Sequence, residues 1–144
     1  MVSEVDRAYL AAFIDGEGYI YIGKVGERLQ LKMAVVNTCL AALRELQLLW
    51  GGSIAKKKRS SEKHKQAYEL RWFKETPTII SEVLFYLKIK KEQARIGLQF
   101  ALTGDYRGGV NEIHLPNTVI EQRKNLQAQM QEVNRRGEQI NKTC

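Results

Sequence analysis

The stretch LAAFIDGEGYIYIGK, residues 10–24, changes from helical to strand character within a few residues. Its first part has the apolar spacing of a buried helix, and its second part alternates as a half-buried strand does. The junction between them carries two acids, Asp15 and Glu17, set between glycines. Core packing gives no reason for carboxylates at this point, so the junction is a candidate functional site.

Helical and hairpin-like segments follow one another along the chain. Ser3 is expected to cap the first helix, with Asp6 completing a capping box. Thr76 is expected to cap the third helix, with Pro77 in its first turn. The expected order is a helix over 4–16, a hairpin turning near Gly26, a helix over about 39–50 stopped by Gly51-Gly52, a hairpin within 53–74, a helix over about 76–87, helices over about 91–102 and 117–134, a turn-rich loop over 103–116 between them, and a frayed tail over 135–144.

Strand, strand and helix occur twice in this order, which predicts an α+β fold class. A chain of 144 residues with 44% hydrophobic content suits one domain with one core. We expect a single domain over 1–144, with its core over about 4–102 and a C-terminal helical extension over about 103–144. Helices on one face of four antiparallel strands leave the other face open. The residues expected on the inner face are Ile20, Ile22, Leu31, Met33, Val35, Tyr68, Leu70 and Trp72.

Positive charge is concentrated in one segment. Residues 53–74 contain eight Lys or Arg and two Glu, so they carry +6 of the chain's net charge of +7. Aromatic residues and strand-like stretches interleave with these cations, which distinguishes the segment from an ordinary solvated loop. A polyphosphate backbone is the partner that this pattern favours.

Membrane, secreted and cysteine-based classes are disfavoured. No run of about 18 apolar residues and no basic leader with an apolar stretch occurs, so we expect an intracellular protein without a membrane partner. Cys39 and Cys144 match no metal-ligand spacing. We expect the first to be a small buried residue and the second to lie on a frayed terminus.

Three features, in order, resemble the LAGLIDADG homing endonucleases, over about residues 5–100. LAAFIDGEG at 10–18 is similar to the nonapeptide of that family, GGSI at 51–54 to its lead into the second hairpin, and LKIKKEQA at 87–94 to its lysine-bearing segment. The resemblance implies a helix-hairpin-helix-hairpin-helix (αββαββα) fold with a four-stranded antiparallel DNA-binding sheet and, here, extra C-terminal helices.

The resemblance also implies a homodimer. Ala8, Ala12 and Gly16 lie four residues apart, a spacing that lets two helices approach closely, although alanine is also simply a good helix former. In the family, two motif helices pack at a twofold or pseudo-twofold axis, and this sequence holds one motif. We therefore expect an isologous homodimer with Ala8, Ala12, Asp15 and Gly16 at the interface.

Catalytic roles follow from the same resemblance. Glu17 matches the metal-binding acid of the motif, although it is one methylene longer than the commoner Asp, and the carbonyl of Gly16 joins it. Mg²⁺ is the expected ion, with Mn²⁺ as a substitute, and Ca²⁺ is expected to support binding with little or no cleavage. Lys90 matches the active-site lysine, with Lys88 and Lys91 as neighbours that could be confused with it.

One part of the family's site departs from its usual pattern. The family often has a Gln just after the second strand, where this chain reads VVNTCLAALR. Asn37 or Thr38 is the expected substitute, and Asn37 is taken as the catalytic candidate. The basic partner is Arg44 or is absent.

A two-stranded ribbon fits the major groove, so the open sheet face is the expected DNA-binding surface. Strands of about eight residues span about 26 Å, comparable to about eight base pairs. Because residues 56–59 would alternate, about half of them should face bases. The expected DNA-binding residues are Tyr19, Tyr21, Lys24, Gln30, Lys32, Lys56, Lys57, Lys58, Arg59, Glu69 and Arg71.

The function implied is that of an intron-encoded homing endonuclease. Such a homodimer would cleave both strands of a long, pseudo-palindromic double-stranded DNA site by Mg²⁺-dependent hydrolysis, in a prokaryotic cytoplasm or an organelle. The alternatives are a maturase of the same fold that binds intron RNA, a non-cutting DNA-binding regulator, and a small basic interaction module. The intact acidic motif together with Lys90 favours the nuclease.

Overall fold

The structure, a computed structural model, describes residues 1–104 and 115–143, with side chains as far as residue 136. Most of the expected loop at 103–116, and Cys144, lie outside the described residues. The α+β class and the αββαββα order are confirmed. The elements are α1 Glu4–Glu17, β1 Gly18–Val25, β2 Arg28–Asn37, α2 Leu40–Trp50, β3 Ser53–Lys56, β4 Tyr68–Trp72, α3 Thr76–Val83, α4 Lys91–Leu102 and α5 Asn117–Thr143.

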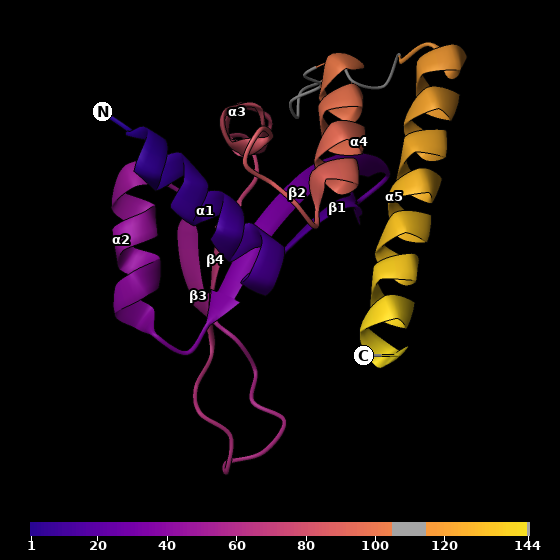
Figure 1. The fold of residues 1–144 in the computed structure, drawn as a ribbon. Coiled ribbons are helices and arrows are strands. Elements are labelled where there is room, and N and C mark those ends of the chain that lie inside the picture. The colour runs from indigo at the N-terminus through magenta and orange to yellow at the C-terminus, as the bar shows by residue number, and fades with distance from the viewer. Residues whose placement is uncertain (105–114, 144) are drawn as a thin grey trace.

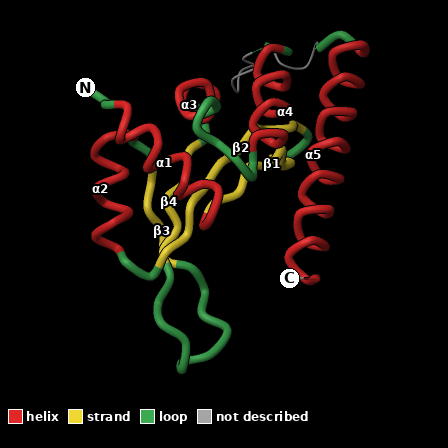
Figure 2. Tube along the Cα trace, in the orientation of Figure 1, coloured by secondary structure: helices red, strands yellow, loops and turns green. Residues whose placement is uncertain are grey.

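The four strands form one antiparallel sheet in the order β1-β2-β4-β3, so two hairpins lie side by side (Figures 1 and 2). In the first hairpin, strands of 8 and 10 residues turn at Gly26, whose φ is 61°. In the second, strands of 4 and 5 residues are joined by the long loop 57–67. The expected strand length of about eight residues is therefore wrong for the second hairpin.

Strand alternation turns one face of the sheet toward the helices. Ile20, Met33, Val35, Leu70 and Trp72 are almost fully buried there, as the sequence predicted. Helices α1 to α4 lie over this face, and α5 stands beside α4 on the side away from α1 (Figure 1). Burying each large side chain contributes about 1.5–3 kcal/mol, so this layer is a large part of what stabilises the fold.

Helix α5 covers the edge strand β1. The side-chain amide of Gln127 donates to the carbonyl of Ile22 at 3.2 Å, and that of Asn134 donates to the carbonyl of Ile20 at 3.1 Å. An uncovered edge strand exposes unpaired backbone groups that can pair with other chains. The C-terminal extension therefore protects the edge of the sheet, a role that its sequence did not indicate.

Three local expectations need correction, whereas the capping box of Ser3 and Asp6 is confirmed. Thr76 is the first residue of α3 and does not cap it, because its buried hydroxyl donates to the carbonyl of Trp72 at 2.8 Å. The backbone of α5 stays helical to Thr143, where a frayed tail was expected. Cys39 is exposed, because it lies at the N-cap of α2, outside the helix's buried stripe.

Candidate active site and nucleic-acid interface

The last turn of α1 is joined to the segment just before α4. The Asp15 carboxylate accepts hydrogen bonds from three consecutive backbone N–H groups, those of Lys88 at 2.8 Å, Ile89 at 3.1 Å and Lys90 at 2.9 Å. The Lys90 ammonium donates to the backbone carbonyl of Asp15 at 2.9 Å. Two parts of the chain predicted separately to belong to the site are therefore in direct contact.

These contacts have a physical cause at both ends. A carboxylate in the last turn of a helix is unfavourable, because the carbonyl end of the helix carries negative partial charge. The N–H groups of residues 88–90 precede α4 and need acceptors, and the N-cap residue Lys90 makes no side-chain capping bond. Asp15 satisfies those donors, and the donors together with the Lys90 cation offset its charge.

Lys90 is half-buried beside the junction. Burial lowers the pKa of its ammonium below the ordinary lysine value, and the charge of Asp15 opposes part of that shift. By contrast, Lys88 is exposed, and its backbone N–H, not its ammonium, makes the contact with Asp15. Of these two lysines, Lys90 is thus the one whose ammonium contacts the end of α1.

Glu17 and Gly16 lie exposed at the end of α1. Within the described part of the chain, no hydrogen bond or ion pair engages the Glu17 carboxylate, and no group of three or more His, Cys, Asp or Glu residues could hold a metal. One chain thus offers one exposed carboxylate and neighbouring backbone carbonyls. These hard oxygen donors fit Mg²⁺, which keeps several waters and needs few protein ligands.

Asn37 lies at the end of β2, where its Oδ1 accepts a hydrogen bond from the Cys39 backbone N–H at 2.7 Å. No hydrogen bond among the described residues joins Asn37 to Asp15, Glu17 or Lys90. Its catalytic role stays a prediction. The alternatives Thr38 and Arg44 are both exposed.

The face of α1 that points away from the core is apolar. Ala8, Ala12 and Gly16 are exposed along it, and a Cβ on Gly16 would meet nothing within 4 Å. Beside them, the side chains of Val5 and Tyr9 are 76% and 50% exposed. A contiguous exposed apolar stripe of this kind is typical of an interaction surface.

The open face of the sheet carries most of the predicted DNA-binding side chains. The strand register places Tyr19 in one row with Arg71, and Tyr21 opposite Lys32. The Lys32 ammonium lies 5.8 Å from the centroid of the Tyr21 ring, close enough for a cation–π interaction. The predicted residues on this face are Tyr19, Tyr21, Gln30, Lys32, Glu69 and Arg71.

One predicted placement on that face is wrong: Lys24 pairs with Leu29, so it alternates with core residues and lies on the helix-covered side, exposed at the strand end. Lys56, whose side the sequence left open, pairs with Tyr68 and lies on the same helix-covered side. The expected alternation of residues 56–59 also fails, because the strand ends at Lys56.

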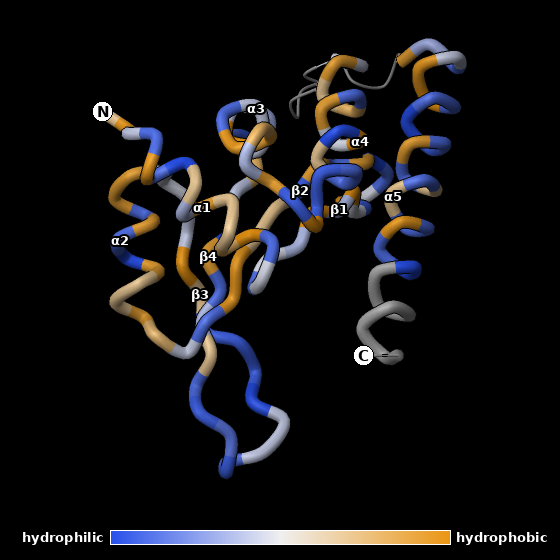
Figure 3. The backbone as a smooth tube through the Cα atoms, in the orientation of Figure 1, coloured by the Kyte–Doolittle hydropathy of each residue, from blue (hydrophilic) through white to orange (hydrophobic). Residues whose placement is uncertain are grey.

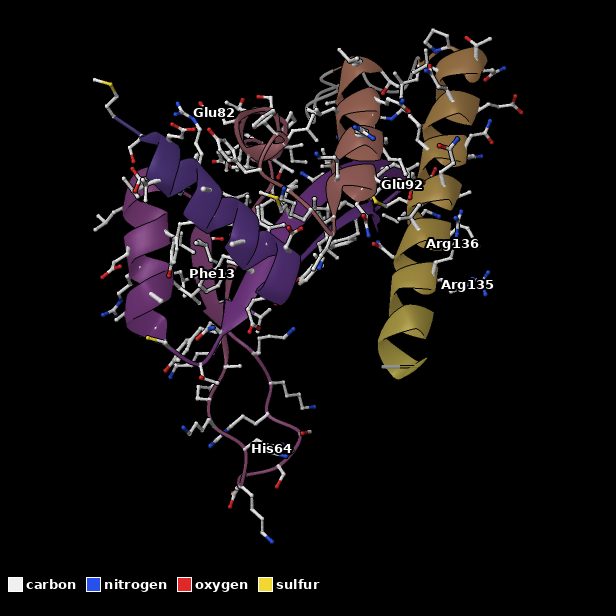
Figure 4. The ribbon with its side chains drawn as sticks, viewed as in Figure 1. Phe13, His64, Glu82, Glu92, Arg135 and Arg136 are labelled. Atoms are coloured by element: carbon white, nitrogen blue, oxygen red, sulfur yellow. The ribbon has the colours of Figure 1, made fainter. Side chains whose placement is uncertain are left out.

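Lys57, Lys58 and Arg59 lie in the loop 57–67. The loop is closed at its base by the Lys57 N–H donating to the Ala67 carbonyl at 2.9 Å. It projects past the sheet as a hydrophilic segment with His64 near its tip (Figures 3 and 4). Its cations can follow a phosphate backbone without the constraint of a strand.

Glu69 is a buried carboxylate at the centre of this surface. Its Oε1 accepts hydrogen bonds from the Tyr19 hydroxyl and from Arg71 Nε, the latter at 2.8 Å, and its Oε2 lies 3.4 Å from the Lys57 ammonium. Burial alone would raise the pKa of Glu69, but these hydrogen bonds and the two cations outweigh burial and hold it below the ordinary value. Burial and the bond to Glu69 raise the pKa of Tyr19.

No protein-family model matches the chain, and no curated protein matches it by sequence. Solved structures match most of it. The homing endonuclease I-CvuI in complex with its target aligns at a TM-score of 0.68, with 22% identity over 90% of this chain and 82% of that chain. An archaeal intron-encoded homing endonuclease, I-Vdi141I, complexed with DNA, aligns at 0.71, with 16% identity over 90% and 84%. The chain has the LAGLIDADG homing endonuclease fold.

The LAGLIDADG meganuclease I-SmaMI, bound to uncleaveable DNA, aligns at a TM-score of 0.67 and 20% identity, over 87% of this chain but only 44% of that one. This chain therefore corresponds to less than half of I-SmaMI. None of the helices in the described residues is long and apolar enough to cross a membrane.

Two parts of the site were missed by the sequence prediction. Asp15 was expected to be structural, near the helix interface; the interface stays a prediction, and what the sequence did not indicate is that its carboxylate accepts hydrogen bonds from the 88–90 segment of its own chain. Glu69 was expected only as a DNA contact, but it is held by three side chains. The alternation of β4 places Glu69 and Arg71 on one face, which is the only sequence signal for that cluster.

Proposed function

We propose that the chain is a site-specific DNA endonuclease that acts as a homodimer and cleaves both strands of a long, roughly palindromic duplex. The observation that carries this proposal is the meeting of Lys90 with the last turn of α1, next to the exposed Glu17 carboxylate. The basic loop 57–67 leaves the sheet at the end where β1 follows the acidic junction. The open face of the sheet begins at the same end. Structures of this fold in complex with DNA give additional support.

The chemistry of one chain supports the proposed homodimer. A single Glu17 is too small a donor set for the two cleavage events of a double-strand break. If the apolar stripe of α1 packs against its copy around a twofold axis, the two Glu17 carboxylates emerge together at the bottom of the helix pair. Each subunit then supplies one carboxylate and one sheet to a half-site.

Each named side chain has a role at the phosphate. Glu17 and the Gly16 carbonyl would hold Mg²⁺, which when bound supplies activation of water and stabilisation of the leaving oxygen. Lys90 stabilises negative charge on the scissile phosphate, and Asp15 fixes the position of Lys90. Mn²⁺ would substitute, whereas Ca²⁺, with looser geometry, would support binding with little or no cleavage.

The deciding experiment compares cleavage with binding in three variants. Glu17→Gln keeps the side-chain size but removes the charge, so cleavage of a plasmid library in Mg²⁺ should be lost while duplex binding and folding survive. Lys90→Met should lose about 10²-fold or more in cleavage rate, the size expected for removing one charge-stabilising group. Lys88→Met is the matched control, and it should cut normally because Lys88 is exposed and contacts Asp15 through its backbone N–H, which the substitution keeps.

Normal cutting by Glu17→Gln would refute the assigned site. If the wild-type protein cuts no library but binds an intron RNA tightly, the maturase alternative replaces the endonuclease. Tight duplex binding without cutting under any of the three ions would instead indicate a non-cutting regulator.

The dimer has a separate test. Ala12→Leu inserts a large side chain into the exposed stripe of α1 and should give monomer by sedimentation, with cleavage abolished. Ala41→Leu places the same change on an exposed position of α2 and should leave the dimer intact. An unchanged dimer of Ala12→Leu with full activity would overturn the α1 interface.

A further inference from the structure

Glu69 is a buried acid on the face that we propose binds DNA, where a negative charge would be unfavourable. It is a carboxylate with 4% exposure, on a face that we propose meets a polyanion. A buried charge is costly unless it is paired, and a negative charge facing phosphate is repulsive. Its position therefore has to be explained by what it does to its neighbours.

Both oxygens of Glu69 are occupied. Oε1 accepts from Tyr19 and Arg71, and Oε2 faces Lys57 at the base of the basic loop. A carboxylate in this state is not free to accept a hydrogen bond from a cytosine amino group, the base contact that an acid would otherwise make. Glu69 is therefore poorly suited to contact a base itself.

Arg71 is well suited to do so. The Glu69 carboxylate holds it through Nε, so the two terminal Nη groups remain available, and its side chain is 43% exposed on the open face. An arginine with both Nη groups presented side by side matches the O6 and N7 acceptors of guanine in the major groove. Holding the guanidinium in advance reduces the rotamer entropy that is lost on binding.

The register locates this contact within the half-site. Arg71 pairs with Ala34 of β2, which in turn pairs with Tyr19 of β1. Tyr19 lies two residues after Glu17, so the row is at the end of the sheet nearest the acidic junction. A base contacted by Arg71 should thus lie close to the cleaved phosphate, on the inner side of each half-site.

We propose that Glu69 is a positioning residue that holds Arg71 to recognise one guanine in each half-site. Tyr19 and Lys57 complete the clamp by fixing the carboxylate. This inference rests on the proposed function, since it requires the open face to bind duplex DNA.

The test is selection of bound sequences from a duplex library with randomised positions, performed with the full chain. The wild type should select guanine at one position in each half-site. Arg71→Lys, which keeps the charge but loses bidentate geometry, and Glu69→Met, which keeps the length but removes the acceptor, should each reduce that preference about tenfold. Glu69→Gln should reduce it less, and it serves as the measurement if Glu69→Met does not fold.

Glu62→Gln is the matched control, because it removes an exposed carboxylate from the loop of the same surface. Both Glu→Gln changes should raise affinity for all duplexes, but only the change at Glu69 should alter base preference. Glu69 variants that keep the full guanine preference, or that alter every position equally, would overturn the inference. A wild type that binds no duplex would overturn the proposed function itself. If the wild type binds duplex but its base preferences do not change in Arg71→Lys, the guanine contact, and with it this inference, is overturned while the proposed function stands.

Discussion

The two hairpins of the sheet follow the same helix-to-strand plan but differ in how their side chains are held. In the first hairpin, β1 and β2 pair along eight positions, turn tightly at Gly26, and are covered at their edge by α5. In the second, β3 and β4 pair along four positions, and the cations lie mostly in the connection 57–67. The first hairpin holds its side chains in a fixed row, whereas the second carries charge on a long loop.

This difference implies a division of tasks on DNA. Side chains fixed on a pleated face can distinguish base edges, because direct recognition needs defined geometry. Cations on a loop provide phosphate neutralisation, which needs charge but little geometry. Glu69 connects the two, since it bonds to Tyr19 of the first hairpin and pairs with Lys57 of the loop.

The largest expected effect concerns one glycine at each hairpin, Gly26 in the turn of the first and Gly52 directly before β3 of the second. Gly52 has φ 92°, and a Cβ there would lie 2.6 Å from the Arg71 carbonyl and 2.8 Å from Trp72 Nε1. Gly52→Ala should therefore lower the free energy of unfolding by about 3 kcal/mol or more, through strain and overpacking together. Gly26→Ala, at φ 61° in open space, should cost only about 1 kcal/mol.

Urea denaturation of both variants measures these free energies. Equal decreases would mean that the second hairpin is not anchored by the close approach of Gly52 to β4. The second hairpin would then have no firmly held strands from which the loop 57–67 projects, and its contrast with the first hairpin would lose its structural basis.

The next effect is on salt dependence. Replacing Lys58 and Arg59 with Gln should reduce the slope of log affinity against log salt by about 0.9 for each phosphate that is no longer neutralised, with base preference unchanged. Lys32→Gln, on the fixed face of the first hairpin, should instead alter preference at one position in each half-site. Fluorescence anisotropy over a range of salt concentrations, combined with sequence selection, separates the two outcomes. A salt-independent affinity of the wild type would contradict the electrostatic role of the loop.

The smallest effect is a dependence of stability on pH that comes from Glu69. Because its pKa in the folded protein lies below the ordinary value of 4.5, the carboxylate stabilises the fold at higher pH. That stabilisation disappears as the pH falls below about 4.5 and through the lowered folded value. Thermal melting of wild type and Glu69→Gln should thus show a difference at pH 7 that shrinks under acid. A constant difference would mean that the clamp does not depend on the charge of Glu69.

The sequence predicted the first hairpin better than the second. Strict alternation and Gly26 specified the strands, turn and inward side chains of the first hairpin, because strand periodicity and turn chemistry are local. The lysine run at 56–59 has no alternation of polarity that marks where pairing stops, so its placement in a strand was wrong. The expected position of Lys24 was also wrong, because Lys24 is two residues after Ile22 and strand alternation therefore turns it to the same, helix-covered side.

The candidate site divides in the same way between local and distant information. The sequence by itself determined the order of helices and strands, the acids at the end of α1 and the open basic face, since each depends on neighbouring residues. Only the tertiary structure decided that Asp15 accepts hydrogen bonds from residues 88–90, which lie 73 to 75 positions further along the chain. The same is true of the bond from Asn134 to β1, which spans 114 positions. The physical reason is that a hydrogen bond between distant segments forms only after the core has packed, and no local propensity specifies its partner.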